Sequence, residues 1–211
     1  MTKAESSEDG QIPFIQEVWR KTTHMGALVI PCGYYLLGLS KGEMLWIMVP
    51  ITALMILIDI SRLRGWPFWT AFGVKIIGGM VRKKEENGDF TGATYILLST
   101  CLTVALYDKY LAIAAISFII VGDTFAALIG RKFGYHKFGG GRKSYEGSLG
   151  CLLGTMLVAV LTPHMPIYAG TFGAVTAAVT EGLSFDIDDN ISVPIVSGLA
   201  MTLFIRVIGP I

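Results

Sequence analysis

The sequence is poor in charged residues and in cysteine. Only 16% of its 211 residues are charged, whereas 53% are hydrophobic, and a soluble domain of this size seldom has that balance. The three cysteines all lie within apolar runs, far apart in the chain, which argues against a disulfide framework or a zinc site. Small buried hydrophobic residues are the simpler interpretation. A net charge of +1 indicates no particular partner, and we expect none to be a nucleic acid.

We also expect no cleavable signal peptide. The first 20 residues are polar and acidic, whereas a signal peptide is basic and then apolar. We expect residues 1–12 to form a disordered tail and residues 13–211 to form a single integral-membrane domain.

Apolar runs recur along most of the chain, and a helix that crosses a bilayer needs roughly 17–25 such residues. The sequence therefore predicts an all-α fold, a polytopic membrane bundle of about seven transmembrane helices. The predicted spans are residues 25–39, 43–60, 93–107, 110–130, 147–161, 167–182 and 191–208. Amphipathic segments are expected on the membrane surface at 13–21 and within 61–92.

Basic residues are distributed unevenly between the two sides of these spans. With the N-terminus in the cytosol, 14 of the 17 lysines and arginines fall on the cytosolic side, as the positive-inside rule requires. We therefore expect a protein of a cell inner membrane or an endomembrane with a cytosolic N-terminus. The glycines of "GCLLG" at 150–154 permit a close helix contact within or between chains, so a homo-oligomer is compatible with the sequence.

Carboxylates gather on the same side. A carboxylate within a span costs roughly 2.5–3.5 kcal/mol on insertion scales, so Asp123 in particular needs a partner. Gly122, Ala126 and Gly130 form a smooth ridge for close packing, and Asp123 beside it should face the bundle interior. The alternative is a purely structural carboxylate neutralised by an arginine such as Arg131.

A glycine-rich basic segment, "FGGGRKS", follows the span that carries Asp123. Its three glycines free the backbone to turn its N–H groups toward an anion, and the segment adds Arg142, Lys143 and Ser144. It is not a Walker A loop, because arginine separates the last glycine from the lysine and no strand precedes it. A flexible basic turn at the membrane surface would look similar.

Two further segments complete the cytosolic set. "DIDDN", residues 186–190, supplies oxygen ligands of the kind that Mg²⁺ takes together with phosphate oxygens, although a helix cap by Asn190 is an alternative. "WRKTTH" places Arg20, Lys21 and His24 at the mouth of the first span, where the two basic residues would also serve as topology anchors or headgroup contacts. Together these groups suit phosphoryl transfer, which depends on positioning and charge neutralisation.

The sequence also resembles the polyprenol kinase family, which includes dolichol kinase, phytol kinase and the CTP-dependent diacylglycerol kinase. The resemblance extends from Arg20 to Pro194 through segments in the family's order: "RKTTHMG", "LIDISRLR", "TGATYILLS", "VGDTFAALIGRKFG", "GGRKSYEGSLG" and "EGLSFDIDDNISVP". It implies an integral-membrane kinase that transfers the γ-phosphate of CTP to the hydroxyl of a membrane lipid alcohol, with Mg²⁺ or another divalent cation.

The resemblance also implies roles for individual residues. The catalytic set is Asp123, Lys143 and Glu146, with Asp123 as base or metal ligand. The nucleotide-binding set is Arg131, Gly139, Gly140, Gly141, Arg142, Lys143 and Ser144. The metal-binding set is Asp123, Glu146, Asp188, Asp189 and Asn190. The substrate-entry set is Arg20, Lys21, His24 and Asp59.

Two other functions stay open at this point. A cytidylyltransferase that makes a CDP-lipid would share CTP, Mg²⁺ and the membrane, and would release pyrophosphate where a kinase releases CDP. A proton-coupled transporter would use Asp123 and Glu181 as proton sites, but the polar groups crowd one face. The motif of CDP-alcohol phosphotransferases is absent from the sequence. The acceptor, whether polyprenol, phytol, geranylgeraniol or diacylglycerol, is not readable from the apolar spans.

Overall fold

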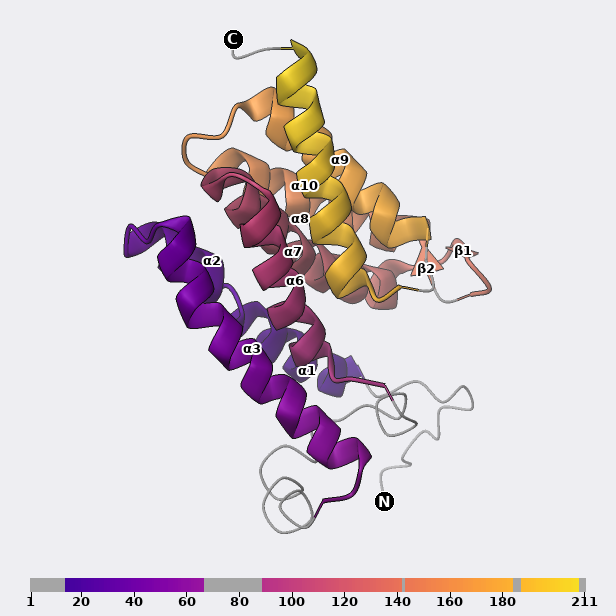
Figure 1. Ribbon diagram of the computed structural model, residues 1–211. Coiled ribbons are helices and arrows are strands. Elements are labelled where there is room, and N and C mark those ends of the chain that lie inside the picture. Colours follow the sequence, from indigo (N-terminus) through magenta and orange to yellow (C-terminus); the bar gives the residue numbers. More distant parts are fainter. Residues whose placement is uncertain (1–13, 67–88, 142, 184–186, 209–211) are drawn as a thin grey trace.

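The computed structural model describes residues 14–66, 89–141, 143–183 and 187–208. The predictions for the tail 1–12, for most of the surface segment within 61–92, for Arg142 and for Asp186 concern residues outside these ranges. Helices make up nearly all of the described chain (Figure 1), which confirms the all-α class.

The described elements are helices and one short hairpin. They are α1 (Phe14–Gly26), α2 (Val29–Leu36), α3 (Lys41–Leu63), α6 (Gly92–Leu106), α7 (Lys109–Phe133), β1 (Lys137–Phe138), β2 (Lys143–Ser144), α8 (Tyr145–Leu161), α9 (Ile167–Leu183) and α10 (Asp189–Ile208). The two strands pair antiparallel, Lys137 opposite Ser144. The prediction that no strand precedes the glycine segment is wrong, because β1 ends directly before it.

Helix α7 forms the centre of the bundle. It packs against α8, α10, α1 and α2, and every residue from Leu111 to Gly122 is buried, as expected for a helix that is apolar on all sides. Helices α3, α7 and α10 are long and apolar enough to cross a membrane, and α6 and α8 are shorter apolar helices. The outer faces of α3 and α10 expose large apolar side chains, as lipid-facing helices do.

Glycines bring α7 and α8 into close contact. A Cβ atom added at Gly122 would lie 2.8 Å from the Thr155 side chain, and one added at Gly150 would lie 3.0 Å from the Phe125 carbonyl oxygen. The small-residue ridge predicted on α7 therefore packs closely. The glycines at 150 and 154 are used for a contact within the chain.

The first predicted span, 25–39, is not a single helix. Helix α1 ends at Gly26 and α2 begins at Val29, with i→i+3 hydrogen bonds across the break at Ala27 and Leu28. Pro31 explains part of the break, because it has no N–H to continue the hydrogen-bond ladder back to Ala27. Helix α1 also packs against α7, so the surface location predicted for 13–21 is wrong at Lys21, which is 1% exposed.

Candidate functional site

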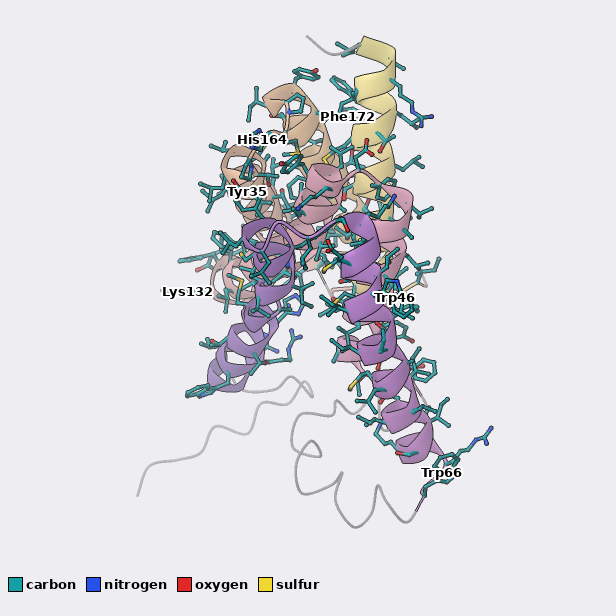
Figure 2. The ribbon with its side chains drawn as sticks, turned by 60° about the vertical axis from the view of Figure 1, so that its left-hand side comes forward. Tyr35, Trp46, Trp66, Lys132, His164 and Phe172 are labelled. Carbon is teal, nitrogen blue, oxygen red and sulfur yellow. The ribbon has the colours of Figure 1, made fainter. Side chains whose placement is uncertain are left out.

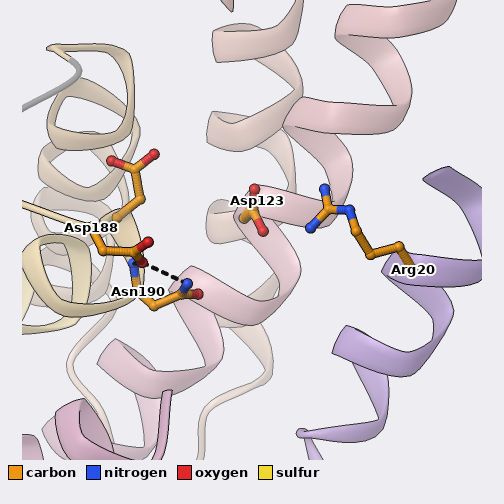
Figure 3. Close-up of a pocket in the computed structure, with 5 residues that line it drawn as sticks. Arg20, Asp123, Asp188 and Asn190 are labelled. Atoms are coloured by element: carbon orange, nitrogen blue, oxygen red, sulfur yellow. Dashed lines mark hydrogen bonds between the residues drawn. The ribbon is translucent and has the colours of Figure 1, made fainter. Parts of the chain in front are cut away.

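A cavity of about 110 Å³ lies where α1, α7 and the start of α10 meet (Figure 3). Its lining residues are Arg20, Asp123, Asp188, Asp189 and Asn190, which all belong to the predicted site. Pockets for whole drug-sized ligands usually measure about 300–1,000 Å³. The cavity therefore has room for an ion or a phosphoryl group, and not for an entire nucleotide.

Asp123 supplies the α7 side of this cavity. The Lys21 ammonium donates a hydrogen bond to Asp123 Oδ2, and His24 Nε2 lies 3.4 Å from the same oxygen. Both partners come from α1, whereas the sequence suggested Arg131 from α7 itself. The ion pair explains how a membrane helix carries the carboxylate, because a buried charge requires a partner.

The start of α10 supplies the opposite side. Asp188 Oδ1 accepts hydrogen bonds from the backbone N–H of Asn190 at 2.9 Å and from its side-chain amide at 2.7 Å. Asp188, rather than the expected Asn190, is thus the residue whose side chain caps the helix. The cap fixes Asp188 and Asn190 at the cavity wall (Figure 3). Asp189 lines the same cavity.

Lys143 ties the hairpin to this wall. Its ammonium donates hydrogen bonds to the backbone carbonyl of Glu181 and to Asp189 Oδ2 at 3.1 Å. It also forms an ion pair with Glu181 Oε1 at 2.9 Å. Burial lowers the pKa of Lys143, but the two carboxylates outweigh it and leave the pKa above its usual value.

Glu181 is the site residue that the predicted sets omit. It lies at the end of α9 with 10% of its side chain exposed, and its contact partner Lys143 is 38 residues earlier in the chain. The available signal was an ionisable residue at the end of an apolar span, which is costly unless paired. That signal marks Glu181 as important but does not identify its partner.

The glycines of the hairpin are required by the turn itself. Gly139, Gly140 and Gly141 have φ values of 58°, 70° and 83°, a region that only glycine adopts readily. The next residue that the structure describes in detail, Lys143, already points into the contact with α9 and α10. Ser144 accepts a hydrogen bond from the Gly147 N–H at 3.1 Å, so its hydroxyl caps α8.

Two other predicted residues lie in separate networks. Glu146 Oε1 is 2.6 Å from His136 Nδ1 beside the hairpin. Asp59, at the end of α3, accepts hydrogen bonds from the Thr91 N–H at 2.8 Å and the Thr94 hydroxyl at 2.7 Å, and so ties α3 to the start of α6. Neither residue is among those described as lining the cavity.

The carboxylates do not make a complete metal site by themselves. Within the described part of the chain, no three His, Cys, Asp or Glu side chains are arranged to hold a metal ion. The cavity does present oxygen atoms from three aspartates and one asparagine, the ligand type that Mg²⁺ prefers. Any Mg²⁺ held there would need further ligands, such as phosphate oxygens and water.

Comparison with known proteins supplies the family. No family model and no solved structure match the chain. An uncharacterized protein of Rickettsia prowazekii is 30% identical over 196 residues, which cover 88% of this chain and 93% of that protein. CTP-dependent diacylglycerol kinase 1 of Saccharomyces cerevisiae is 26% identical over 216 residues, covering 90% of this chain and 74% of the kinase. The chloroplastic farnesol kinase of Arabidopsis thaliana is 30% identical over 146 residues, covering 58% of this chain and 47% of the kinase.

The chain belongs to the polyprenol kinase family. This confirms the resemblance found in the sequence motifs. Apolar helices and membrane lipid kinase relatives together make it an integral membrane protein. For a polyprenol kinase family member, the cavity between α1, α7 and α10 is the natural candidate for the site of phosphoryl transfer, because it brings together motif residues that lie up to 170 positions apart in the sequence.

Proposed function

We propose that the protein is a CTP-dependent lipid kinase, which transfers the γ-phosphate of CTP to the hydroxyl of a membrane lipid alcohol at the cytosolic face of the membrane. The named kinase relatives support a phosphotransferase that acts on an alcohol. One structural observation carries the assignment of the site: a basic residue of α1, the carboxylate of α7 and the acidic start of α10 line the same cavity.

CTP is proposed as the donor because the yeast relative is a CTP-dependent enzyme by name. The cavity volume of about 110 Å³ suits the terminal phosphate. The ribose and base then lie outside it, on the side of the glycine hairpin. Arg20 lines the cavity and offers the planar, multidentate donor that suits phosphate oxygens.

Mg²⁺ is proposed because the donor atoms fit it. Asp123, Asp188, Asp189 and Asn190 would hold the ion, and the nucleotide phosphates would complete its ligands, since Mg²⁺ is usually bound by one or two carboxylates plus substrate phosphates. The ion would supply charge neutralisation on the phosphate oxygens. Glu146 belonged to the predicted metal set as well, but in the structure it hydrogen-bonds His136.

The residues of the chain contribute positioning and charge. The alcohol oxygen attacks the γ-phosphorus and loses its proton to Asp123 or to water, the bond from this phosphorus to the β–γ bridging oxygen breaks, and CDP leaves. Arg20 neutralises charge on the transferred group. Lys143, which the predicted nucleotide set already contains, reaches the phosphates once it exchanges Asp189 for a phosphate oxygen. Asp123 remains either the base or a metal ligand.

The orientation follows from the distribution of charge. The hairpin of β1 and β2 lies at the same end of the bundle as the start of α10 (Figure 1), and the spans predicted from the sequence assign 14 of the 17 lysines and arginines to this side. The positive-inside rule supports a cytosolic location for that side. The cavity would then open toward the compartment that contains CTP.

The experiment is a product assay with purified protein, γ-labelled CTP or ATP, Mg²⁺ and a panel of diacylglycerol, farnesol, phytol and a polyprenol. We expect label in the lipid, CDP as the second product and a preference for CTP. Release of pyrophosphate would indicate a cytidylyltransferase and contradict the kinase. The panel also identifies the acceptor, which the described residues do not specify.

A further inference from the structure

An aromatic pair lies beside the candidate site and is largely open to solvent. Phe138 in β1 and Tyr145 at the start of α8 have ring centroids 4.9 Å apart, with their planes tilted by 42°. Tyr145 is 66% exposed, and its backbone N–H donates a hydrogen bond to the His136 carbonyl at 3.1 Å. An exposed ring that has a fixed backbone and a second ring packed against it offers a flat face on which a planar ligand can stack.

The hairpin directs this pair toward the Lys143 contact. Phe138 and Lys143 are directly opposite each other in the hairpin, so their side chains lie on the same face. The Lys143 ammonium reaches Glu181 and Asp189 at the end of α9 and the start of α10 (Figure 1). The Phe138 ring lies beside the next residue of α9, because a Cβ atom added at Gly182 would be 3.8 Å from Phe138 Cζ. The aromatic pair therefore adjoins the lysine that ties the hairpin to the cavity wall.

The order of these groups matches the order of groups in a nucleoside triphosphate. The cavity of about 110 Å³ has room for the terminal phosphate, and Asp189 in its wall contacts Lys143. Charged groups thus come first on the way out of the cavity, and the aromatic surface beside Lys143 comes next. A phosphate chain likewise leads to a ribose and then to a planar base, whose face stacks on aromatic side chains.

We propose that Phe138 and Tyr145 form the binding site for the nucleobase of the donor nucleotide, which stacks on the Tyr145 ring. This inference rests on the proposed kinase function for the class of ligand. Because every base has a face that can stack, the pair supplies affinity and does not select cytosine over adenine. Tyrosine is also enriched at membrane–water interfaces, so contact with lipid headgroups is the alternative outcome of the test.

The test compares three variants. Tyr145→Leu removes the ring and keeps an apolar side chain, Tyr145→Phe keeps the ring, and Tyr135→Leu is a matched control at a tyrosine that is 82% exposed shortly before β1. We expect Tyr145→Leu to raise KM for CTP about tenfold, as expected for the loss of one base–aromatic stack, with KM for the lipid unchanged. Tyr145→Phe should retain most of the affinity for CTP, and Tyr135→Leu should match the wild type.

A binding measurement separates this inference from the proposed reaction. Thermal unfolding of lipid-free protein in detergent is followed with Mg²⁺ and either CTP or inorganic tripolyphosphate, which has three phosphates and no base. We expect Tyr145→Leu to reduce the rise in Tm that CTP causes and to leave the rise caused by tripolyphosphate unchanged. If Tyr145→Leu does not fold, Tyr145→Gln replaces it.

Four results would overturn the assignment of the aromatic pair. The first is a CTP-induced rise in Tm that survives in Tyr145→Leu, and the second is an equal loss with CTP and tripolyphosphate. The third is a higher KM for the lipid in place of CTP, which would indicate a headgroup contact, and the fourth is a wild type that CTP does not stabilise. A wild type that binds CTP through Tyr145 but transfers no phosphate would instead support the base site and contradict the kinase.

Discussion

Two lysine–carboxylate contacts hold the site together, and they differ in how deeply the lysine is buried and in how many acceptors it has. Lys21 and Asp123 meet between two packed helices, where the lysine side chain is 2% exposed and the aspartate side chain 26% exposed. The Lys143 side chain at the hairpin is 16% exposed, and its partners Glu181 and Asp189 are 10% and 34% exposed. The first contact connects two helices through one carboxylate, whereas the second shares an ammonium among acceptors that differ in exposure.

This difference suggests that the two contacts have different roles. The buried pair fixes α1 and α7 so that Arg20, Asp123 and His24 keep their positions. In the second contact, Glu181 supplies two acceptors and is largely buried, while Asp189 supplies one and lines the cavity. Glu181 is therefore the lasting partner of Lys143, and Asp189 is the one that a nucleotide would displace. Figure 2 shows how α1 and α2 on one side and α3 on the other diverge below the turn that joins them, so α1 depends on α7 for its placement.

The largest effect should come from Asp123→Asn. The variant keeps an oxygen for Lys21 but loses the charge, and we expect kcat to fall at least about 10²-fold, as when an electrostatic catalytic group is removed. The protein should still insert and fold, which size-exclusion chromatography in detergent checks. Near wild-type turnover would show that Asp123 is not required for phosphoryl transfer.

Lys21→Met should damage the fold as well as the activity. It leaves the Asp123 carboxylate buried without its ammonium partner, a loss of about 3–5 kcal/mol of stability in comparable cases. Thermal unfolding in detergent should show a clear drop in Tm. Lys143→Ala is the comparison variant. It also leaves a largely buried carboxylate, Glu181, without its ammonium, but the Lys143 side chain is 16% exposed, so we expect a smaller drop in Tm than for Lys21→Met. Equal losses of Tm in the two variants would contradict the distinction between a deeply buried and a partly exposed lysine.

Lys143→Ala should act on the nucleotide. Loss of one charge-assisted hydrogen bond to phosphate should raise KM for CTP about tenfold while KM for the lipid changes little. Steady-state kinetics with each substrate varied in turn measures the split. The reverse pattern would move Lys143 to the lipid site. Glu181→Gln should show the same split more weakly, because the backbone carbonyl of Glu181 still accepts from Lys143.

A smaller effect is expected from pH on the hairpin contact. The folded protein raises the pKa of Lys143 above the reference value of 10.5, so the contact's stabilisation is fully present below that pH and is lost as pH rises through the folded pKa. Amine labelling of Lys143, followed by mass spectrometry, should lag behind labelling of the exposed Lys137 until pH exceeds about 10.5. Equal labelling of the two at pH 8 would show that Lys143 is not held by Glu181 and Asp189.

The sequence was sufficient to predict those spans whose position in the bundle depends mainly on their apolar character. Residues 110–130, for instance, are apolar on all sides and became the buried helix α7. It was not sufficient for the first span, because the effect of Pro31 and the packing of α1 on α7 depend on tertiary contacts. The glycines of the hairpin were correctly singled out, but their positive φ values explain them without any ligand.

Pairing within the site was largely beyond the sequence. Lys21 and Asp123 are 102 residues apart, and nothing in either motif names the other as its partner. Asp59 and Ser144 carried motif signals, yet the structure uses both to hold helix starts. A hydrogen-bonding side chain near a helix start reads the same in sequence whether it binds a ligand or caps the helix.

The most direct measurement is an experimental structure of the protein with Mg²⁺ and a non-hydrolysable CTP analogue. We predict that the terminal phosphate occupies the cavity between Arg20, Asp123 and Asp189, and that Lys143 has left Asp189 for a phosphate oxygen while it keeps Glu181. A triphosphate bound elsewhere, with the cavity and both lysine contacts unchanged, would contradict the proposal that this cavity is the site of phosphoryl transfer.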